Sequence, residues 1–382
     1  MSQKINIVVF ILLFAIIPVS VPCTGASETA SFPSLASAVR IMEELFFCGE
    51  RVPLENPEIR ERLERELLIS LWQRHQALLW IKRSSRYFPV IERILKEEGL
   101  PEDLKYVPVA ESALRPHAGS HKGAVGYWQF MAHTARKYGL TVSAGIDERR
   151  NIFASTRAAA RHFKDLYEMF GSWTLAAAAY NMGEGGLTAE ILEQETEDFY
   201  RLYLYLETQA YIFRILSAKL IISSPEKYGF FLKETDYYRP VESRRVSVIC
   251  ERETPVRVVA RAAGTHFKVI KDLNPEIRGH NLAKGSYMLR VPPEGAEGFG
   301  ERFKREMIAF VEDDRRRIYV VQIGDNLSAI ARRFDVPLAA LVIWNGIDPS
   351  RPIHPGDRLV IYPGRGLNPE VDEGSEQREA GK

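Results

Sequence analysis

The stretch VPVAESALRPHAGSHKGAVGYWQFM, residues 107–131, decides how this chain of 382 residues is interpreted. It begins as an apolar helical segment that ends in a carboxyl group, Glu111. A glycine turn follows and leads to the aromatic ring of Trp128 and the amide of Gln129. A carboxyl group that loses hydration in a cleft stays protonated near neutral pH and can act as a general acid. The segment therefore predicts an acid beside a turn that a ligand can approach closely.

A second polar segment lies downstream, where AYNMGEGG, residues 179–186, ends an Ala-rich helical stretch. Tyr180 could place its hydroxyl beside the acid and steer the carboxylate. A structural interpretation stands beside the functional one, because Asn181 and Gly183 could merely end a helix while Tyr180 packs. For Trp128, burial in the core is favoured over contact with a ligand, because large aromatic side chains are mostly buried.

The composition is that of a globular protein of more than one domain. Apolar residues make up 46% of the chain and charged residues 26%, and 51 Lys and Arg nearly balance 50 Asp and Glu. A chain of this length usually forms two or three domains. The balance of charge lacks the basic footprint of a nucleic-acid binder, so no nucleic-acid partner is expected. No Cys or His spacing suggests a metal site, no cofactor is expected, and Cys48 and Cys250 are interpreted as unpaired thiols.

Residues 1–26 predict an export signal or an amino-terminal anchor. An uncharged apolar run, INIVVFILLFAIIPVSV, follows a basic start, and small residues come after it. The short run and Pro18 favour cleavage over retention in the membrane, and Cys23 leaves lipid attachment as a third alternative. We therefore expect an exported protein of the periplasm or cell envelope, with membrane association through the amino terminus as an alternative.

Helical periodicity dominates the first two thirds of the chain, which divides into a helical region at 27–98 and a domain at 99–235. One helix is predicted from Asn56, a capping residue, through the stretch ending IKR at residue 83. A second helix is predicted to run through FPVIERILKEEGL and to stop at Gly99.

Beyond Pro240 the sequence changes to short β-branched runs separated by Gly and Pro. Two segments, 243–295 and 318–363, repeat one outline of strand, helix, helix and strand. Asp325 or Asn326 is expected to cap the first helix of the later copy. A charged connector is expected between the copies, and a disordered polar tail at 364–382.

These pieces in this order resemble the lytic transglycosylases of bacterial cell walls, in particular the membrane-bound type D branch with carboxy-terminal LysM modules. The resemblance is carried by Glu111-Ser112, by Ser120 with GAVGYWQFM, by AYNMGEG and by Glu207-Thr208. It implies a mainly α catalytic domain of goose-lysozyme-like (α+β) fold, followed by small βααβ LysM modules. The later repeat resembles LysM strongly, and the earlier one resembles a diverged copy.

The resemblance also implies a reaction, in which the β-1,4 bond between N-acetylmuramic acid and N-acetylglucosamine breaks without water. Glu111 would be the single catalytic acid, and the muramoyl C6 hydroxyl would attack its own C1 to close a 1,6-anhydro ring. The expected partners are peptidoglycan glycan strands, and a monomer is expected. The residues implied to bind substrate are Ser112, Ser120, Gln129, Met131, Tyr180, Asn181 and Glu207, and those implied to bind glycan in the LysM module are Gly324, Asp325, Asn326 and Asn345.

Two other functions stay open at this point. A hydrolytic muramidase of the same fold would need a second carboxylate to activate water, and Asp147 or Glu184 are the nearest candidates in sequence. A non-catalytic wall-binding protein would use only the repeats. For the earlier repeat, glycan binding and a ligand-free packing role are equal alternatives. Departures from the family pattern at Lys122, Tyr127, Ala132 and Asn151 concern the shape of the subsites rather than the acid.

Overall fold

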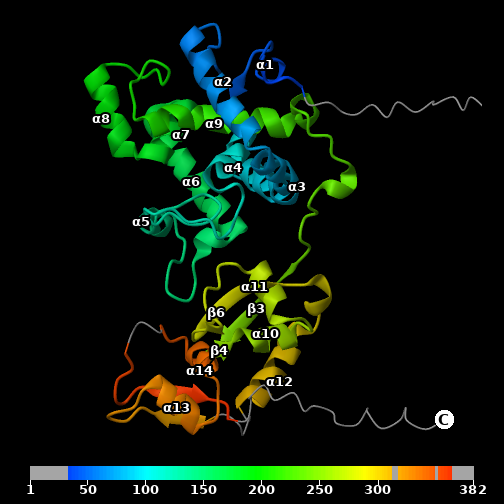
Figure 1. Cartoon of the computed structure of the whole chain (residues 1–382), viewed down its shortest axis with the longest axis vertical. Helices are drawn as coiled ribbons and strands as arrows, with labels where there is room; N and C mark the ends of the chain where they lie inside the picture. Colours follow the sequence, from blue (N-terminus) through cyan, green and yellow to red (C-terminus); the bar gives the residue numbers. More distant parts are fainter. Residues whose placement is uncertain (1–32, 312–316, 349–351, 364–382) are drawn as a thin grey trace, which may run out of the picture.

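The computed structural model describes residues 33–311, 317–348 and 352–363. A helical domain lies at one end of the molecule, and two small modules lie beyond it, the second farthest away (Figure 1). The predicted leader and the predicted tail at 364–382 lie outside the described residues. Within the described ranges, no helix is long and apolar enough to cross a membrane.

The amino-terminal helices differ from the predicted ones. α2 runs over Pro57–Trp72, and the Asn56 side chain accepts a hydrogen bond from the Glu58 N–H at 3.0 Å. The backbone turns at Gln73, and α3 then continues as one helix over Arg74–Glu97 with Pro89 inside it. The predicted start at Asn56 and the stop at Gly99, which has a φ of 69°, are confirmed, whereas the division between the two helices was wrong because the apolar steps continue across Gln73 and hide the break. Packing of α3 against α6 and α9 supports the helix where Pro89 removes a backbone hydrogen bond.

Short elements complete the helical domain and position its loops. Its remaining elements are α1 (Leu35–Ala38), β1 (Phe46–Phe47), β2 (Glu50–Arg51), η1 (Glu102–Tyr106), α4 (Val107–Ser112), α5 (Ala132–Lys137), η2 (Glu148–Arg150), α6 (Ile152–Phe170), α7 (Trp173–Met182), α8 (Glu184–Gln194), α9 (Leu206–Ser223), η3 (Pro225–Tyr228) and η4 (Glu234–Asp236).

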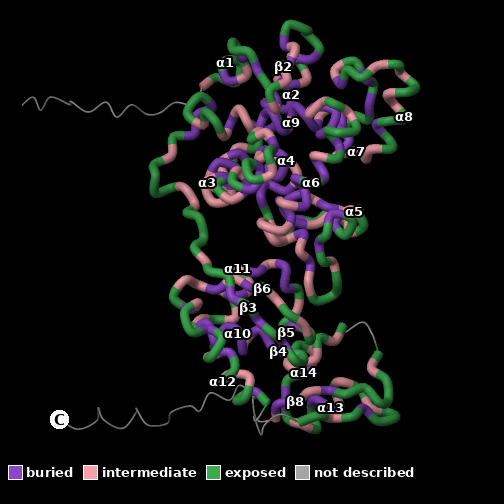
Figure 2. The backbone as a smooth tube through the Cα atoms, turned by 180° about the vertical axis from the view of Figure 1, so that it is seen from behind, coloured by how far each residue is buried: buried purple, intermediate pink, exposed green. Residues whose placement is uncertain are grey.

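Helix α9 forms the centre of this domain. It packs against α2, α3, α4 and α7, and the buried tube at the middle of the domain in Figure 2 includes it. Ile212, Phe213 and Leu216 are fully buried, and α7 meets α9 through a run of buried alanines at 176–179. A helix that is apolar on most of its faces belongs inside a protein. From Thr208 onward, α9 therefore lies in the interior of the domain beside α4, whereas Leu206 at its start is exposed.

Each carboxy-terminal module is a two-stranded antiparallel sheet with two helices. In the first, β3 (Arg244–Cys250) pairs with β6 (Gly285–Val291), and the helices are α10 (Val256–Ala262) and α11 (Phe267–Leu273). In the second, β7 (Arg317–Val320) pairs with β8 (Arg358–Ile361), and the helices are α13 (Leu327–Arg333) and α14 (Leu338–Asn345). The strand, helix, helix and strand order is the predicted one. The first module adds the short pair β4 (Thr254–Pro255) and β5 (Asn281–Leu282), followed by η5 (Pro293–Gly295).

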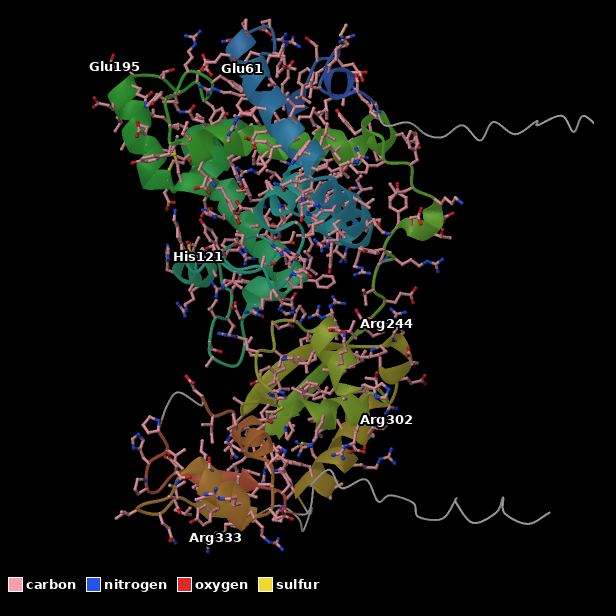
Figure 3. The ribbon with its side chains drawn as sticks, viewed as in Figure 1. Glu61, His121, Glu195, Arg244, Arg302 and Arg333 are labelled. Atoms are coloured by element: carbon pink, nitrogen blue, oxygen red, sulfur yellow. The ribbon has the colours of Figure 1, made fainter. Side chains whose placement is uncertain are left out.

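The segment predicted as a charged connector is largely a helix, α12, over Phe299–Val311. Phe299, Phe303 and Phe310 are buried, and α12 packs against α10. Arg302, labelled in Figure 3, donates hydrogen bonds to the carbonyls of Gly295 at 2.7 Å and Ala262 at 2.6 Å. The connector prediction was wrong because the charges outnumber the phenylalanines, although the phenylalanines share one helical face.

A loop of the helical domain joins the first module by backbone pairing. The Asp147 N–H donates to the Glu276 carbonyl at 2.8 Å, and the Arg278 N–H donates to the Gly145 carbonyl at 2.9 Å. Nearby, the Arg290 guanidinium lies 3.5 Å from the centre of the Phe153 ring. The first module is therefore attached to the helical domain through the loop before α6.

Candidate active site

Glu111 is the penultimate residue of α4, at a point where the backbone turns sharply. Ala113 and Leu114, the second and third residues after Glu111, have left-handed φ angles of 52° and 57°. Such angles in consecutive residues other than glycine are costly and are found where the surrounding structure enforces them. They end α4 directly after the acid, so the Glu111 side chain lies at the wall of a cleft.

A tyrosine that sequence reasoning missed contacts the acid. The hydroxyl of Tyr211 donates a hydrogen bond of 2.5 Å to Glu111 Oε1, and the Tyr211 side chain is buried. Tyr211 lies on α9 one helical turn after Glu207, so both side chains lie on one face of that helix. The spacing of four residues was the available signal, but the apolar surroundings of Tyr211 indicate only a core residue.

The environment of Glu111 favours its protonated form. Loss of hydration raises the pKa of Glu111 from 4.5 to about 7, and the charge of Glu207 acts in the same direction. The hydrogen bond from Tyr211 and the charge of Arg214 both lower this pKa and limit the rise. A carboxyl group with a pKa near the working pH can donate a proton and later accept one.

The glycine turn beside the acid is held from behind by a buried ion pair. Gly126 has a φ of 86°, and a Cβ atom there would lie 1.9 Å from the Arg149 carbonyl oxygen. The buried Arg149 guanidinium pairs with both oxygens of Asp147, at 2.8 and 2.9 Å. It also donates to the carbonyls of Gly123 and Phe130, at 3.0 Å each. Only glycine fits at position 126, and the turn is rigid.

The acid and the turn enclose a cleft of about 430 Å³. His121, labelled in Figure 3, marks the turn side of this cleft. Most of the substrate residues expected from the sequence lie along it, although their side chains come from four separate segments of the chain. The expected residues that line the cleft are Glu111, Ser120, Gln129, Met131, Tyr180, Asn181 and Glu207, and those not expected are His121, Lys122, Ala124, Phe130, Thr134 and His162.

Several polar side chains of the cleft are already bonded within the protein. Gln129, at a left-handed φ of 49°, donates from Nε2 to the Gly126 carbonyl at 2.8 Å. Ser120 Oγ accepts from the Ala124 N–H at 3.1 Å, and Asn181 Oδ1 accepts from Thr208 Oγ1 at 2.9 Å. These bonds fix the orientation of the side chains that a ligand would meet.

Two residues have a different role from the one expected. The Tyr180 side chain lines the cleft with Glu111, but its hydroxyl donates to the Trp128 carbonyl at 2.7 Å and not to the carboxyl group of Glu111. Ser112 is 3% exposed, and its hydroxyl donates to the Tyr127 carbonyl at 2.7 Å. Ser112 therefore joins α4 to the turn and has no face toward a substrate. Trp128 is fully buried and donates from Nε1 to Thr156 Oγ1 at 3.0 Å, as core burial requires.

Comparison with known proteins places this geometry in a family. The transglycosylase SLT domain model matches residues 88–202, and the LysM domain model matches residues 319–361. Membrane-bound lytic murein transglycosylase D of Escherichia coli K12 is 32% identical over 371 residues, which is 90% of this chain and 80% of that protein. The chain belongs to the lytic murein transglycosylase family.

Other relatives match smaller parts of this transglycosylase. Peptidoglycan transglycosylase gp16 of Escherichia phage T7 is 37% identical over 112 residues, 28% of this chain and 8% of that protein. Among solved structures, the 70 kDa soluble lytic transglycosylase of Escherichia coli is 19% identical with a TM-score of 0.32, over 41% of this chain and 27% of that one.

In this transglycosylase, the two carboxylates considered for hydrolysis do not line the cleft. Asp147 is 1% exposed and bonded to Arg149. Glu184, at the start of α8, lies 3.8 Å from Lys137. Among the described residues that line the cleft, Glu207 is the second carboxyl group beside Glu111.

His162 of the transglycosylase lies in the cleft wall and was missed by sequence reasoning. Its ring stacks at 4.7 Å from the Tyr138 ring, and burial lowers its pKa to about 4. The imidazole is therefore neutral at pH 7, and its charge does not compete with the acid.

The polar residues expected to bind glycan in the second module hold the module together. Asp325 accepts from the Tyr319 hydroxyl at 2.6 Å, and Asn326 caps α13 through the Ala329 N–H at 2.8 Å. Asn345 donates to the carbonyls of Leu341 and Val360 and accepts from the Val360 N–H. These side chains have structural bonds, although Asn326 is exposed together with Gly324, which has a φ of 88°.

The first module repeats the hydrogen bonds of Asn345 but has other residues in place of Gly324, Asp325 and Asn326. Asn274 makes the same bonds as Asn345, with the carbonyls of Ile270 and Arg290 and the Arg290 N–H. Glu253, Thr254 and Pro255 precede α10 in the place where Gly324, Asp325 and Asn326 precede α13.

Proposed function

We propose that this protein cleaves the bond between N-acetylmuramic acid and N-acetylglucosamine in peptidoglycan and leaves 1,6-anhydromuramoyl ends. The observation that carries the proposal is the acid itself. Glu111 has a pKa near 7 and is bonded to a buried tyrosine in a cleft of about 430 Å³. Membership of the lytic murein transglycosylase family supports the same reaction.

In the first step, Glu111 donates its proton to the glycosidic oxygen as the bond from that oxygen to the muramoyl C1 breaks. The carboxylate that results accepts the hydrogen bond from Tyr211, which stabilises the negative charge as it forms. In the second step, the muramoyl C6 hydroxyl bonds to C1 and gives its proton to Glu111. The acid is restored, and no water enters the product.

One carboxyl group suffices for this reaction because the substrate supplies the nucleophile. Glycosidases that hydrolyse their substrates need a second carboxylate to attack C1 or to activate water. In this transglycosylase the requirement is instead that C6 and C1 are held close together, which the rigid turn at Gly126 and the bonded amide of Gln129 support.

Hydrolysis is the second candidate, and Glu207 is the residue that would perform it. Its carboxyl group lines the cleft and raises the pKa of Glu111. A Glu207→Gln variant separates the two reactions, because a base that activates water is indispensable for hydrolysis but not for anhydro-ring closure.

The decisive experiment is product analysis on purified sacculi, with wild type, Glu111→Gln and Glu207→Gln compared side by side. Mass spectrometry distinguishes the products, since the anhydro product is one water lighter than the hydrolysis product. We expect anhydro ends from wild type and from Glu207→Gln, and no soluble product from folded Glu111→Gln. Reducing ends throughout would contradict the proposal.

We further infer that the second module binds glycan beside Gly324. The match of residues 319–361 to the LysM domain supports this, and the neighbouring Ile323 is 91% exposed. Weak sugar sites tethered to a catalytic domain raise the local concentration of substrate. In a Glu111→Gln background, Ile323→Asp is expected to reduce binding to insoluble wall, whereas Ile308→Asp, at a position on α12 that is 56% exposed, is the control.

We also infer that the protein acts in the cell envelope, on the basis of the predicted amino-terminal export signal and its membrane-bound relative, and we propose that it is a monomer. Fractionation of cells, with and without the first 26 residues, tests the location, and sedimentation of the purified protein tests the oligomeric state.

A further inference from the structure

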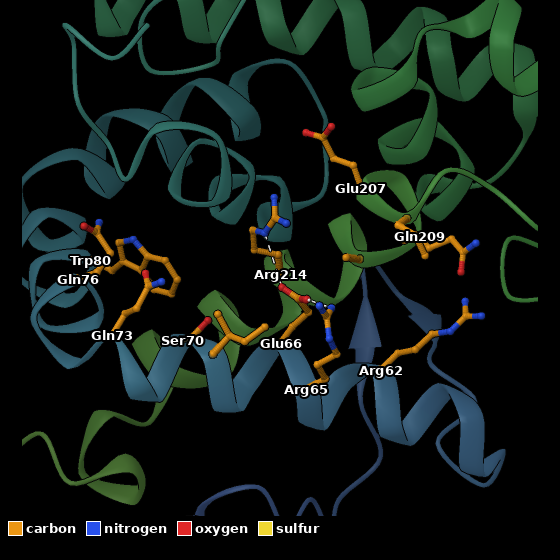
Figure 4. Close-up of a pocket in the computed structure, with 13 residues that line it drawn as sticks. Arg62, Arg65, Glu66, Ser70, Gln73, Gln76, Trp80, Glu207, Gln209 and Arg214 are labelled. Carbon is orange, nitrogen blue, oxygen red and sulfur yellow. Dashed lines mark hydrogen bonds and ion pairs between the residues drawn. The ribbon is translucent and has the colours of Figure 1, made fainter. Parts of the chain in front are cut away.

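A second and larger cavity, of about 870 Å³, adjoins the active-site cleft. Glu207 is the one residue that lines both, among the residues that the structure describes. Figure 4 shows Glu207 at one edge of this cavity, with the side chains of α2, α3 and α9 below it. A substrate strand bound at Glu111 therefore has open space directly beyond Glu207.

The walls of this cavity come from outside the matched SLT domain. One wall is a stripe of α2 and α3 that runs from Arg62 to Trp80 at steps of three and four residues, through the break at Gln73. The other wall is α9 from Leu206 to Arg214. The domain match covers residues 88–202, so neither wall belongs to it. The break at Gln73 bends the stripe around the cavity.

The charge on these walls is arranged around one buried carboxylate. The Glu66 side chain is 6% exposed and lies 2.8 Å from Arg65 Nη1 and 3.7 Å from Arg214 Nε (Figure 4). A guanidinium has five N–H donors in a planar fork, so one carboxylate does not use all of them. Arg65 and Arg214 keep 66% and 36% of their side-chain surface exposed. Glu66 therefore orients the guanidinium of Arg65 and attracts that of Arg214. Arg62, which pairs with Glu58, adds a third guanidinium along the same wall.

We propose that this cavity binds the peptide stem of the muramoyl residue through the carboxylates of that peptide. The inference rests on the proposed function, because it concerns the same substrate strand. Unmodified glycan carries no charge, whereas the peptide that hangs from each muramoyl lactyl group carries carboxylates and small apolar side chains. Arginine is the side chain that recognises a carboxylate by two parallel hydrogen bonds. The exposed Ile69 and Leu206 in the same walls offer apolar contact to the methyl groups of the peptide.

The size and the position of the cavity fit this occupant. Ligand sites commonly occupy about 300–1,000 Å³, and a peptide of a few residues needs most of that range. Arg214 follows Tyr211, the residue bonded to Glu111, by three residues on α9, so its guanidinium lies on the side of the cavity next to the acid. The peptide stem branches from the sugar ring, and a side cavity next to the cleft can accept such a branch.

The test compares two forms of one substrate. Uncrosslinked glycan strands that carry their peptides are digested beside the same strands after an amidase has removed the peptides. We expect wild type to cleave the peptide-bearing strands faster, and Arg65→Gln to reduce the ratio of the two rates by about tenfold, the usual effect of losing one charge-assisted hydrogen bond. Arg65→Lys keeps the charge without the fork and should lie between the two.

Arg93→Gln is the matched control. Arg93 is 57% exposed, pairs with a helical glutamate as Arg65 does, and lies outside both cavities. For Arg93→Gln, the ratio of the rates on peptide-bearing and peptide-free strands should equal that of wild type. Binding of the free stem peptide to Glu111→Gln, followed by NMR, adds a readout without catalysis, and Arg65→Gln in that background should weaken it.

The outcomes separate the two proposals. Equal rates on both substrates for wild type, with no effect of Arg65→Gln and no binding of the free peptide, would overturn the peptide site while leaving the transglycosylase reaction intact. If peptide-free strands were cleaved faster with increasing length, and Arg65→Gln removed that dependence, the cavity would bind sugar and the proposal would be wrong. Failure of wild type to cleave either substrate would instead contradict the proposed function.

Discussion

At the scale of single residues, the pair of Glu111 and Tyr211 decides how the acid works. Burial raises the pKa of Glu111, and the hydroxyl of Tyr211 moderates the rise by stabilising the charged form. The position of Glu111 at the end of an apolar helix is by itself a weak signal, because a glutamate near a helix end is more often solvated, and the resemblance to the family is what singled out this residue. Tyr211 was not predictable from the sequence, since a tyrosine among Ile, Phe and Leu is typical of a core.

We expect the rate constant for cleavage to fall as the pH rises above about 7, because Glu111 must carry its proton to act. Tyr211→Phe removes an interaction that lowers the pKa of Glu111, so the alkaline fall should move to higher pH. The maximal rate should also drop, by about 10- to 100-fold, because the carboxylate loses a charge-assisted hydrogen bond. Initial rates on soluble glycan from pH 5 to 9 measure both effects. An unshifted profile in Tyr211→Phe would contradict this role.

The same residue makes the stability of the fold depend on pH. The folded state holds a proton on Glu111 between pH 4.5 and about 7 that the unfolded chain releases, so the free energy of unfolding falls as the pH rises through this window. A difference of this size corresponds to at most about 3 kcal/mol. Glu111→Gln should therefore be more stable than wild type at pH 8 and equally stable at pH 4. Urea denaturation at the two pH values measures the difference, and equal stability at pH 8 would disprove it.

At the scale of elements, packing determines helix boundaries and buried faces that the periodicity of the sequence does not reveal. The apolar pattern of α2 and α3 is continuous, yet the chain breaks at Gln73, and α12 hides three buried phenylalanines among charges. The strands and helices of the two modules were predictable because each short apolar run is bounded by turn residues. The bond from the Tyr180 hydroxyl to the Trp128 carbonyl could not be predicted from the sequence, because a hydroxyl can reach several acceptors and only the folded geometry selects one.

The turn at Gly126 allows a sharp test of element packing. Gly126→Ala would place a Cβ atom 1.9 Å from the Arg149 carbonyl at a φ of 86°, so we expect a loss of at least about 3 kcal/mol and of most activity. Gly123→Ala is the control, because its φ of 89° is similar but no atom lies within 4 Å. It should cost only about 1 kcal/mol. Urea denaturation of both variants separates the collision from the backbone strain, and equal losses would show that the collision is absent.

At the scale of the whole molecule, the first module is a fixed neighbour of the catalytic domain. Backbone pairing at Ile146 and Ile277, the bond from Asn151 Nδ2 to Glu276 Oε1 at 2.9 Å and the Arg290 contact with Phe153 all lie at one junction. Asn151 is one of the departures from the family pattern, and its amide serves this junction. The sequence could not reveal the junction, because its partners are more than 100 residues apart.

Arg290→Gln is expected to loosen this junction. Loss of a guanidinium stacked on an aromatic ring costs about 1–2 kcal/mol when the contact is shielded from water. Amide hydrogen exchange of residues 143–151 should become faster by about tenfold. Arg245→Gln, on the same strand pair and exposed, is the control. If exchange is unchanged in Arg290→Gln, the guanidinium does not hold the two parts together.

Asp147 contacts both the first module and the residue that supports the catalytic cleft. Its backbone N–H holds the first module at the Glu276 carbonyl, and its carboxylate holds Arg149, which in turn grips the carbonyls of Gly123 and Phe130 at the rim of the cleft. A bacterial wall is stretched by the pressure of the cell, and a chain anchored to it by its far module would be pulled. Because the Asp147 backbone shares that load with the contacts of Asn151 and Arg290, and its carboxylate braces Arg149, tension in the wall would reach the rim of the catalytic cleft through this junction.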